Sequence, residues 1–169
     1  MAGIKIIHFV RIILTIMAVG WMFIIFGFSN QKGDDSAGLS EKVSYRIIKT
    51  SSDLRNEQVS ESELWKRAKK IEYPVRKLAH MSEYAIMAML WFFTIMSYGI
   101  KSKAAFIAPV LIVFLYACTD EIHQLFVADR SGKFTDVLFD TSGALIMMLM
   151  IFAVEVVIRK CRHTKLSGS

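Results

Sequence analysis

Cysteine is scarce in this chain: only two of its 169 residues are cysteines. Cys118 falls inside a long apolar run, Cys161 lies beyond the last such run, and nothing resembles a Cys-x-x-Cys pair. We therefore expect neither a disulfide framework nor a cysteine-ligated zinc site. Cys118 is most simply interpreted as a small buried hydrophobic residue.

Two further patterns are missing. Segments of about 10 residues with alternating polar and apolar side chains do not occur, which argues against a membrane β-barrel. The net charge is +6, but no basic patch is interleaved with a recognisable nucleic-acid-binding module, so no nucleic-acid partner is expected. Basic residues that flank membrane helices and contact anionic lipid explain the excess charge more simply.

Apolar residues make up 54% of the chain and are concentrated in four long runs. A segment in lipid must satisfy its own backbone hydrogen bonds, so these runs predict an all-α integral membrane protein with four transmembrane helices in a single domain, residues 1–169. The first run lacks a small-residue cleavage pattern before Ser29, which favours a retained anchor over a signal peptide. Pro74 is expected to mark the start of the second helix. The four helices are predicted at about residues 5–28, 75–98, 104–127 and 136–158, followed by a frayed tail.

The stretch 29–74 is the only long polar section, and we expect it to form an extracytoplasmic loop. Apolar residues recur every four positions from 39 to 47, and a second apolar stripe that contains Trp65 runs beside several lysines. Ser60 and Glu63 fit a capping box at the start of that second segment. These patterns predict two amphipathic helices. The second is expected to lie in the membrane interface, the alternative being a solvated helix packed on the outer loops.

The orientation in the membrane is predicted from the basic residues. Lys101 and Lys103 lie between the second and third helices and the tail is basic, so cytoplasmic termini satisfy the positive-inside rule at that face. The 29–74 loop nevertheless carries more Lys and Arg than any other loop, and a raw count favours the opposite orientation. We expect both termini in the cytoplasm, partly because of the family resemblance described below.

Ionisable residues inside otherwise apolar helices are the most informative feature, because charge is costly in a bilayer and marks candidate functional sites. They fall in three groups: HMSEY near residue 80, DEIHQ near residue 120 and DVLFD at residues 136–140. Since consecutive helices alternate in direction, all three groups should meet at one membrane face. The candidate ligand-binding residues are Lys77, His80, Glu83, Tyr84, Asp120, Glu121, Gln124, Arg130, Asp136 and Asp140.

Several kinds of chemistry are open to such a cluster. Arg130 and the neighbouring lysines are suited to an anion such as a lipid phosphate. The candidates for acid–base catalysis are His80, Asp120 and Glu121. No two histidines have ligand spacing on one helix, so we expect neither a metal site nor a cofactor. The remaining alternative is a structural network that fixes helix packing, in which Arg130 clamps a carboxylate.

The same residues carry a family resemblance. The segments KLAHMSEYAIMAML and DEIHQLFVADRSGKFTDVLFDTSGA resemble the VanZ-like family of bacterial membrane proteins. The resemblance covers about residues 10–155, although that family tends to have Asn at the position of Asp140. The matching residues are Lys77, His80, Tyr84, Asp120, Glu121, Gln124, Arg130, Asp136 and Gly143.

The family takes its name from a glycopeptide-resistance accessory protein linked to teicoplanin tolerance. The resemblance therefore implies a multi-pass protein of the bacterial cytoplasmic membrane with a cell-envelope role and its polar cluster at the outer leaflet. The partners it implies are membrane lipid and a lipid-linked wall precursor. The resemblance supplies no reaction, and a small intramembrane hydrolase or transferase acting on a lipid-linked substrate stays open as the alternative function.

Overall fold

The computed structural model describes the backbone of residues 2–31, 33–128 and 130–167, and the side chains of residues 4–31, 37–128 and 130–162. All regular structure within these ranges is helical, which confirms the predicted all-α class. The helices are α1 (Ala2–Ser29), α2 (Gly33–Leu54), α3 (Glu61–Ser97), α4 (Ala104–Gln124) and α5 (Phe134–Ser167).

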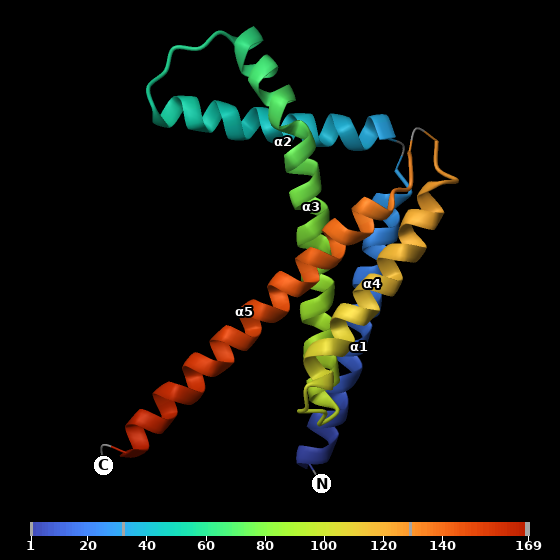
Figure 1. Cartoon of the computed structure of the whole chain (residues 1–169), viewed down its shortest axis with the longest axis vertical. Coiled ribbons are helices and arrows are strands. Elements are labelled where there is room, and N and C mark those ends of the chain that lie inside the picture. The colour runs from blue at the N-terminus through green and yellow to red at the C-terminus, as the bar shows by residue number, and fades with distance from the viewer. Residues whose placement is uncertain (1, 32, 129, 168–169) are drawn as a thin grey trace.

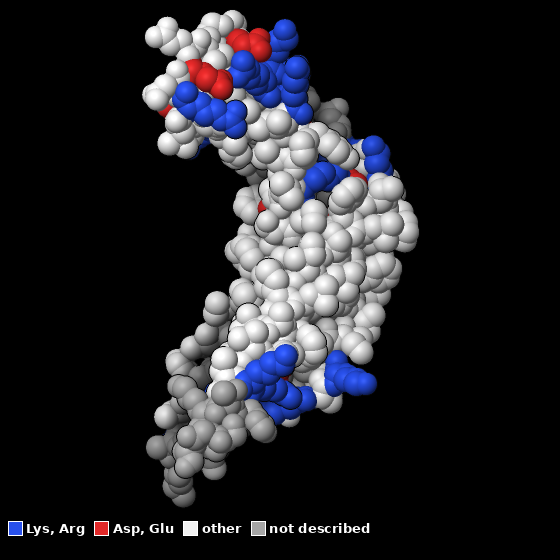
Figure 2. Space-filling model, turned by 60° about the vertical axis from the view of Figure 1, so that its left-hand side comes forward, with Lys and Arg blue, Asp and Glu red and all other residues white. Residues whose placement is uncertain are grey.

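Four of these helices, α1, α3, α4 and α5, are long and apolar enough to cross a membrane. They run along the length of the molecule, whereas α2 lies across one end, and both termini lie at the other end (Figure 1). Lys and Arg gather at the two ends of the face in Figure 2, and the broad region between them is almost free of charge. This charge distribution is typical of a multi-pass membrane protein.

The predicted helix boundary at Pro74 is wrong. Helix α3 runs without a break from Glu61 to Ser97 and contains Pro74 in its interior. An interior proline removes one backbone hydrogen bond and costs about 3 kcal/mol. Packing on both sides offsets this cost, because Leu64 and Ala68 are buried before the proline and Tyr84 is buried after it. The second predicted amphipathic segment is therefore the N-terminal part of a helix that is long and apolar enough to span a membrane.

Other predicted boundaries differ at the helix ends. The third transmembrane helix was expected to reach residue 127, but α4 ends at Gln124 and a turn follows. The fourth was expected at 136–158 with a frayed tail, whereas α5 begins at Phe134 and continues to Ser167. The helical tail is basic, which suits the negative end of the helix dipole.

Helix α3 lies at the centre of the bundle and packs against all four other helices. It approaches α5 closely at Gly143, where a Cβ atom would lie only 2.2 Å from the carbonyl oxygen of Met81. Side-chain donors on α1 also cap backbone carbonyls of α3: Trp21 Nε1 donates to Glu83 O at 2.9 Å, and Arg11 Nε donates to Ser97 O at 2.9 Å. These contacts hold both ends of the α1–α3 pair.

Helix α2 crosses α3 at the end opposite the termini (Figure 1). The rings of Tyr45 and Trp65 stack there with centroids 4.2 Å apart, and Ser44 is fully buried. The predicted apolar stripe of α2, by contrast, is exposed at Leu39, Val43 and Ile47. A helix with one packed face and one exposed apolar stripe is suited to the membrane surface. The interfacial position expected for the second amphipathic segment, which contains Trp65, stays a prediction.

Candidate functional site

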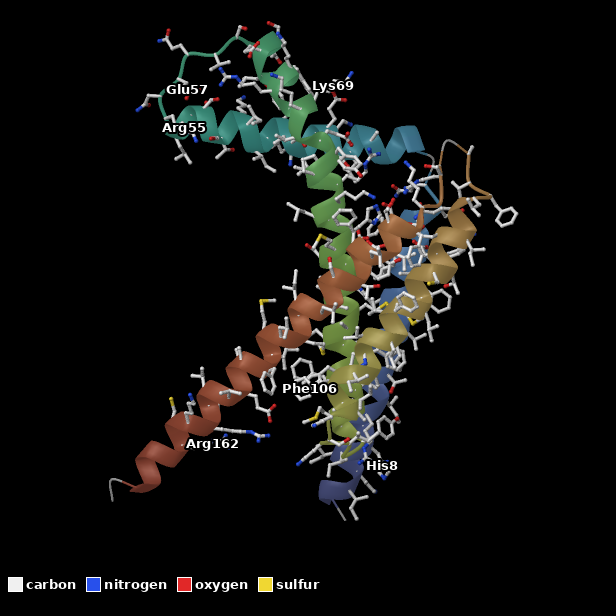
Figure 3. The ribbon with its side chains drawn as sticks, viewed as in Figure 1. His8, Arg55, Glu57, Lys69, Phe106 and Arg162 are labelled. Atoms are coloured by element: carbon white, nitrogen blue, oxygen red, sulfur yellow. The ribbon has the colours of Figure 1, made fainter. Side chains whose placement is uncertain are left out.

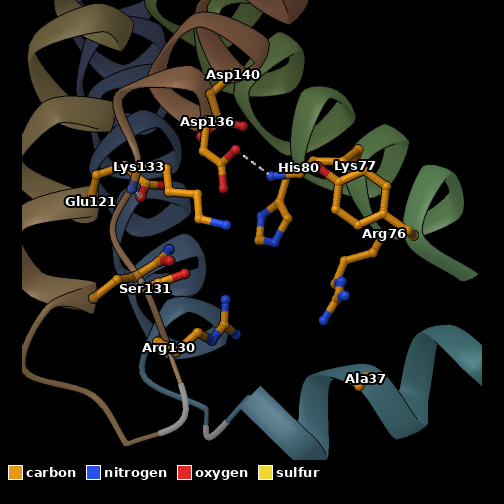
Figure 4. Close-up of a pocket in the computed structure, with 12 residues that line it drawn as sticks. Ala37, Arg76, Lys77, His80, Glu121, Arg130, Ser131, Lys133, Asp136 and Asp140 are labelled. Carbon is orange, nitrogen blue, oxygen red and sulfur yellow. Dashed lines mark hydrogen bonds and ion pairs between the residues drawn. The ribbon is translucent and has the colours of Figure 1, made fainter.

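A polar cavity of about 330 Å³ lies at the end of the bundle beneath α2. Its volume is at the lower end of the range of small-molecule sites. The walls come from α2, α3, the end of α4, the hairpin after α4 and the start of α5 (Figure 4). The lining residues are Ala37, Tyr73, Arg76, Lys77, His80, Glu121, Gln124, Arg130, Ser131, Lys133, Asp136 and Asp140.

Three groups distant in the sequence meet at this cavity, as the alternating helix directions predicted. Seven of the ten candidate residues line it: Lys77, His80, Glu121, Gln124, Arg130, Asp136 and Asp140. The other three, Glu83, Tyr84 and Asp120, do not line it. Glu83 and Tyr84 lie about one turn after His80 on α3, and Asp120 directly precedes Glu121 on α4. Their role in binding stays a prediction.

Three opposite-charge contacts involve residues of the cavity wall, and in the first of them Arg76 Nε lies 3.4 Å from Glu72 Oε1 on the same helix. Lys77 Nζ lies 2.6 Å from Asp136 Oδ1, joining α3 to the start of α5 (Figure 4). His80 Nδ1 lies 3.4 Å from Glu83 Oε2, one turn along α3. The side chains of Lys77, Asp136, His80 and Glu83 are each only 15–21% exposed, so these charges are largely removed from solvent. Pairing lowers the cost of keeping them there.

Glu121 is held by the backbone of the hairpin that follows α4. The backbone N–H of Lys133 donates to Glu121 Oε2 at 2.7 Å. The hairpin can approach this closely because residue 132 is glycine: a Cβ there would lie 2.2 Å from the carbonyl oxygen of Glu121. This arrangement leaves the ammonium group of Lys133 directed into the cavity (Figure 4).

Arg130 is fixed by backbone carbonyls at the end of α1. Its Nε donates to Gln31 O at 3.1 Å and its Nη2 donates to Phe28 O at 3.4 Å. The alternative in which Arg130 clamps a carboxylate is therefore wrong: within the described side chains, the hydrogen-bond partners of Arg130 are backbone carbonyls. Burial lowers the pKa of Arg130 from its ordinary value, and the positive charge of Arg76 lowers it further. A guanidinium nevertheless stays charged at neutral pH.

A second polar layer lies beneath the cavity, in the core between α1, α3 and α4. Asp120 Oδ2 accepts hydrogen bonds from Tyr84 Oη at 3.1 Å and from Gln124 Nε2 at 3.2 Å. Gln124 also donates to Ser29 Oγ at 2.9 Å. Tyr84 is completely buried and Asp120 is 4% exposed. This chain of contacts ties three membrane helices together directly below the cavity floor.

Sequence reasoning missed part of the cavity wall. Tyr73 and Arg76 line it beside Lys77 and His80, and these four residues follow the i, i+3, i+4, i+7 spacing of one helix face. That spacing was the available signal. The expected helix start after Pro74 hid Tyr73, whereas Arg76 lay inside the expected helix and was overlooked. Ala37 from α2 also lines the cavity, and no sequence pattern singled it out.

Some polar residues near the cluster are engaged elsewhere. The ring of His123 packs on Phe26 with centroids 4.6 Å apart, and its Nε2 lies 3.4 Å from Asn30 Oδ1. The hydroxyls of Ser82 and Ser142 donate to carbonyls of their own helices. Within the described side chains, no group of three His, Cys, Asp or Glu is arranged to hold a metal ion. The cavity chemistry therefore rests on the cationic groups, His80 and the carboxylates.

Four helices long and apolar enough to cross a membrane, with a charged cavity at one end of the bundle, define the class of this protein: a helical multi-pass membrane protein with a polar site. The sequence profile of the VanZ/LLP1 family matches residues 14–157, so the chain belongs to this family. No curated protein and no solved structure matches the chain. The family match confirms the resemblance drawn from the polar residues.

Proposed function

We propose that this VanZ-like protein binds the anionic phosphate of a lipid or lipid-linked wall precursor in the polar cavity, and that binding changes glycopeptide susceptibility. Arg130 carries the proposal. Its guanidinium is held in place by two backbone carbonyls and faces the cavity with its charge uncompensated by those contacts. A cation fixed in this way is prepared to donate charge-assisted hydrogen bonds to an anion.

The other charges around the cavity support an anionic ligand. The cationic residues in the wall are Arg76, Lys77, Arg130 and Lys133, against Glu121, Asp136 and Asp140. Lys77 pairs with Asp136, and Glu121 accepts a backbone N–H, so two carboxylates are already engaged. Arg76 pairs with Glu72 at 3.4 Å, and its positive charge still lowers the pKa of Arg130 across the cavity. A bound phosphate between them would relieve that repulsion.

The proposal includes an orientation. We infer that the cavity opens at the outer leaflet of the bacterial cytoplasmic membrane and that both termini are cytoplasmic. The basic residues at the opposite end of the bundle, among them Lys101, Lys103 and Arg159, support this orientation under the positive-inside rule. The basic residues of α2 and the outer part of α3 count against it. Cysteine labelling of Ser62→Cys and Ser102→Cys in intact cells tests the assignment, because only the outer one reacts with an impermeant thiol reagent.

One contact favours the alternative of catalysis on a lipid-linked substrate. His80 lines the cavity and its Nδ1 lies 3.4 Å from Glu83 Oε2, so the carboxylate orients the ring and leaves Nε2 available for proton transfer. Glu121 lies in the opposite wall as a second acid–base group. In this alternative, the phosphate held by Arg130 would itself react, whereas in the binding function it is only bound.

The test compares wild type with Arg130→Ala in a susceptible Gram-positive host at matched membrane levels, and measures the lowest inhibitory concentration of teicoplanin. We expect wild type to raise this concentration and Arg130→Ala to abolish the increase. Arg46→Ala is the matched control, because Arg46 lies exposed on α2 away from the cavity. If both variants behave as wild type, Arg130 has no such role.

A second measurement separates binding from turnover. Purified protein is incubated with phosphatidylglycerol or with undecaprenyl pyrophosphate, and bound lipid and released phosphate are measured. Binding without release, lost in Arg130→Ala, supports the binding function. Release of phosphate that is lost in Glu121→Gln or His80→Ala supports the enzyme instead. Inorganic phosphate competes in both cases only if the phosphate group alone is recognised.

A further inference from the structure

A second site lies at the opposite end of the bundle, where α5 diverges from α3 and α4 (Figure 1). A hollow of about 330 Å³ at this end is lined by Lys101 and Lys103 from the α3–α4 turn and by Arg159 from α5. Both lysines are exposed, and Arg159 pairs with Glu155 one turn earlier on α5. Three cations face one carboxylate, so the hollow is basic.

Two apolar grooves begin at this hollow. One, about 460 Å³, runs between α4 and α5 and shares Lys103, Phe106 and Phe152 with the hollow. The other, about 630 Å³, runs between α3 and α5 and shares Met96, Glu155 and Arg159 with it. The basic hollow therefore adjoins both grooves.

An aromatic contact separates the two grooves. The rings of Phe106 and Phe152 meet edge to face with centroids 5.8 Å apart, and Phe106 also packs on Phe92 of α3 at 5.1 Å. Figure 3 shows Phe106 in the space between α5 and the rest of the bundle, and the side chain of Arg162 extends from α5 back toward that space. The grooves thus lie on either side of one bridge, with cationic groups at their common end.

We propose that this region binds one diacyl anionic phospholipid from the leaflet opposite the polar cavity. The phosphate occupies the basic hollow, and one acyl chain lies in each groove on either side of the Phe106–Phe152 contact. Basic pockets between membrane helices are a common mode of anionic headgroup recognition. This site is distinct from the polar cavity and does not depend on the function proposed for it.

The charge at the hollow favours a lipid over a second copy of the chain. In a dimer with its two-fold axis along the membrane normal, each copy would bring the same Lys101, Lys103 and Arg159 to the same membrane level. Like charges brought together in this way repel each other. An anionic headgroup is complementary to them, and two acyl chains fit two apolar grooves.

The test is lipid binding to the full chain in detergent, measured by native mass spectrometry with dioleoyl phosphatidylglycerol and with dioleoyl phosphatidylcholine. All proteins carry Arg130→Ala, so that binding at the polar cavity does not obscure the result. We expect Lys101→Gln with Lys103→Gln to weaken phosphatidylglycerol binding about 30-fold, since each basic contact near an anionic headgroup contributes roughly fivefold. Lys66→Gln with Lys69→Gln, an exposed pair at the other end of the chain, should leave binding unchanged.

A second pair of variants tests the groove itself. Leu149→Trp should fill the α4–α5 groove and reduce binding, because Leu149 lines it and is 66% exposed. Leu115→Trp is the control, since Leu115 is 63% exposed on α4 and does not line the groove. Equal binding of the two lipids, equal effects of the two lysine pairs, or a lipid-free dimer that Leu149→Trp dissociates would each overturn the proposal.

Discussion

Replacing Gly143 with alanine should force α3 and α5 apart next to the polar cavity. The added Cβ would lie 2.2 Å from the carbonyl oxygen of Met81 and 2.9 Å from its carbonyl carbon. Because these are backbone atoms, no side-chain rotation relieves the clash. The helices must separate by about 0.8 Å to reach the 3.0 Å limit below which such contacts are not observed.

The expected cost follows from that separation. A gap of about 0.5–1 Å forfeits a quarter to a half of the dispersion energy of each contact along the interface. Overpacking of this kind typically costs about 1–3 kcal/mol, and the rigid backbone partner places this case near the upper limit. For a chain of this size, we expect a loss of about 5–10 °C in the melting temperature.

Thermal unfolding in detergent, followed by tryptophan fluorescence, measures this loss. The control is Gly20→Ala on α1, where an added Cβ has nothing within 4 Å. That change should be neutral or stabilising by up to about 1 kcal/mol through helix propensity. Adding Met81→Ala to Gly143→Ala should not restore stability, because the clash involves the backbone of residue 81. If the melting temperature of Gly143→Ala equals that of Gly20→Ala, α3 and α5 do not approach each other as closely as described.

Two further changes test the polar contacts. Tyr84→Phe removes one of the two donors to Asp120 in a fully buried site, so the free energy of unfolding should fall by about 1–3 kcal/mol. The check is SDS-induced unfolding, with the exposed Tyr98→Phe as the control; an unchanged midpoint would contradict the contact. Lys77→Met leaves Asp136 without its ion-pair partner at a mostly buried position and should cost about 2 kcal/mol, whereas Lys77→Met with Asp136→Leu should recover most of that loss. A double-mutant cycle with no coupling between the two positions would refute the pair.

The membrane spans and the meeting of the polar groups could be predicted from the sequence. Long apolar runs fix where helices cross a bilayer, and an alternating path must return every second helix end to the same face. His80, Glu121 and Asp136 therefore had to lie near one another whatever the details of packing. The resemblance to VanZ-like proteins rested on the same residues and is confirmed by the family match.

The continuity of α3 and the full cavity wall could not be predicted in this way. Proline is a local signal for a helix boundary, whereas Pro74 is tolerated because tertiary contacts on either side hold the helix. The partners of Arg130 were also out of reach, since they are backbone carbonyls about 100 positions away in the sequence. Backbone acceptors carry no sequence pattern, so only the packing of the hairpin against α1 reveals them.

The unbroken α3 also has a mechanical consequence. At about 1.5 Å per residue, its 37 residues extend about 55 Å, well beyond the roughly 30 Å of the hydrocarbon core. One continuous helix therefore carries the contact surface for α2, the cavity residues Lys77 and His80, and the C-terminal end that receives Arg11. A displacement of α2 would therefore act on the same helix that carries Lys77 and His80, and α3 is long enough to pass it toward the opposite end of the bundle.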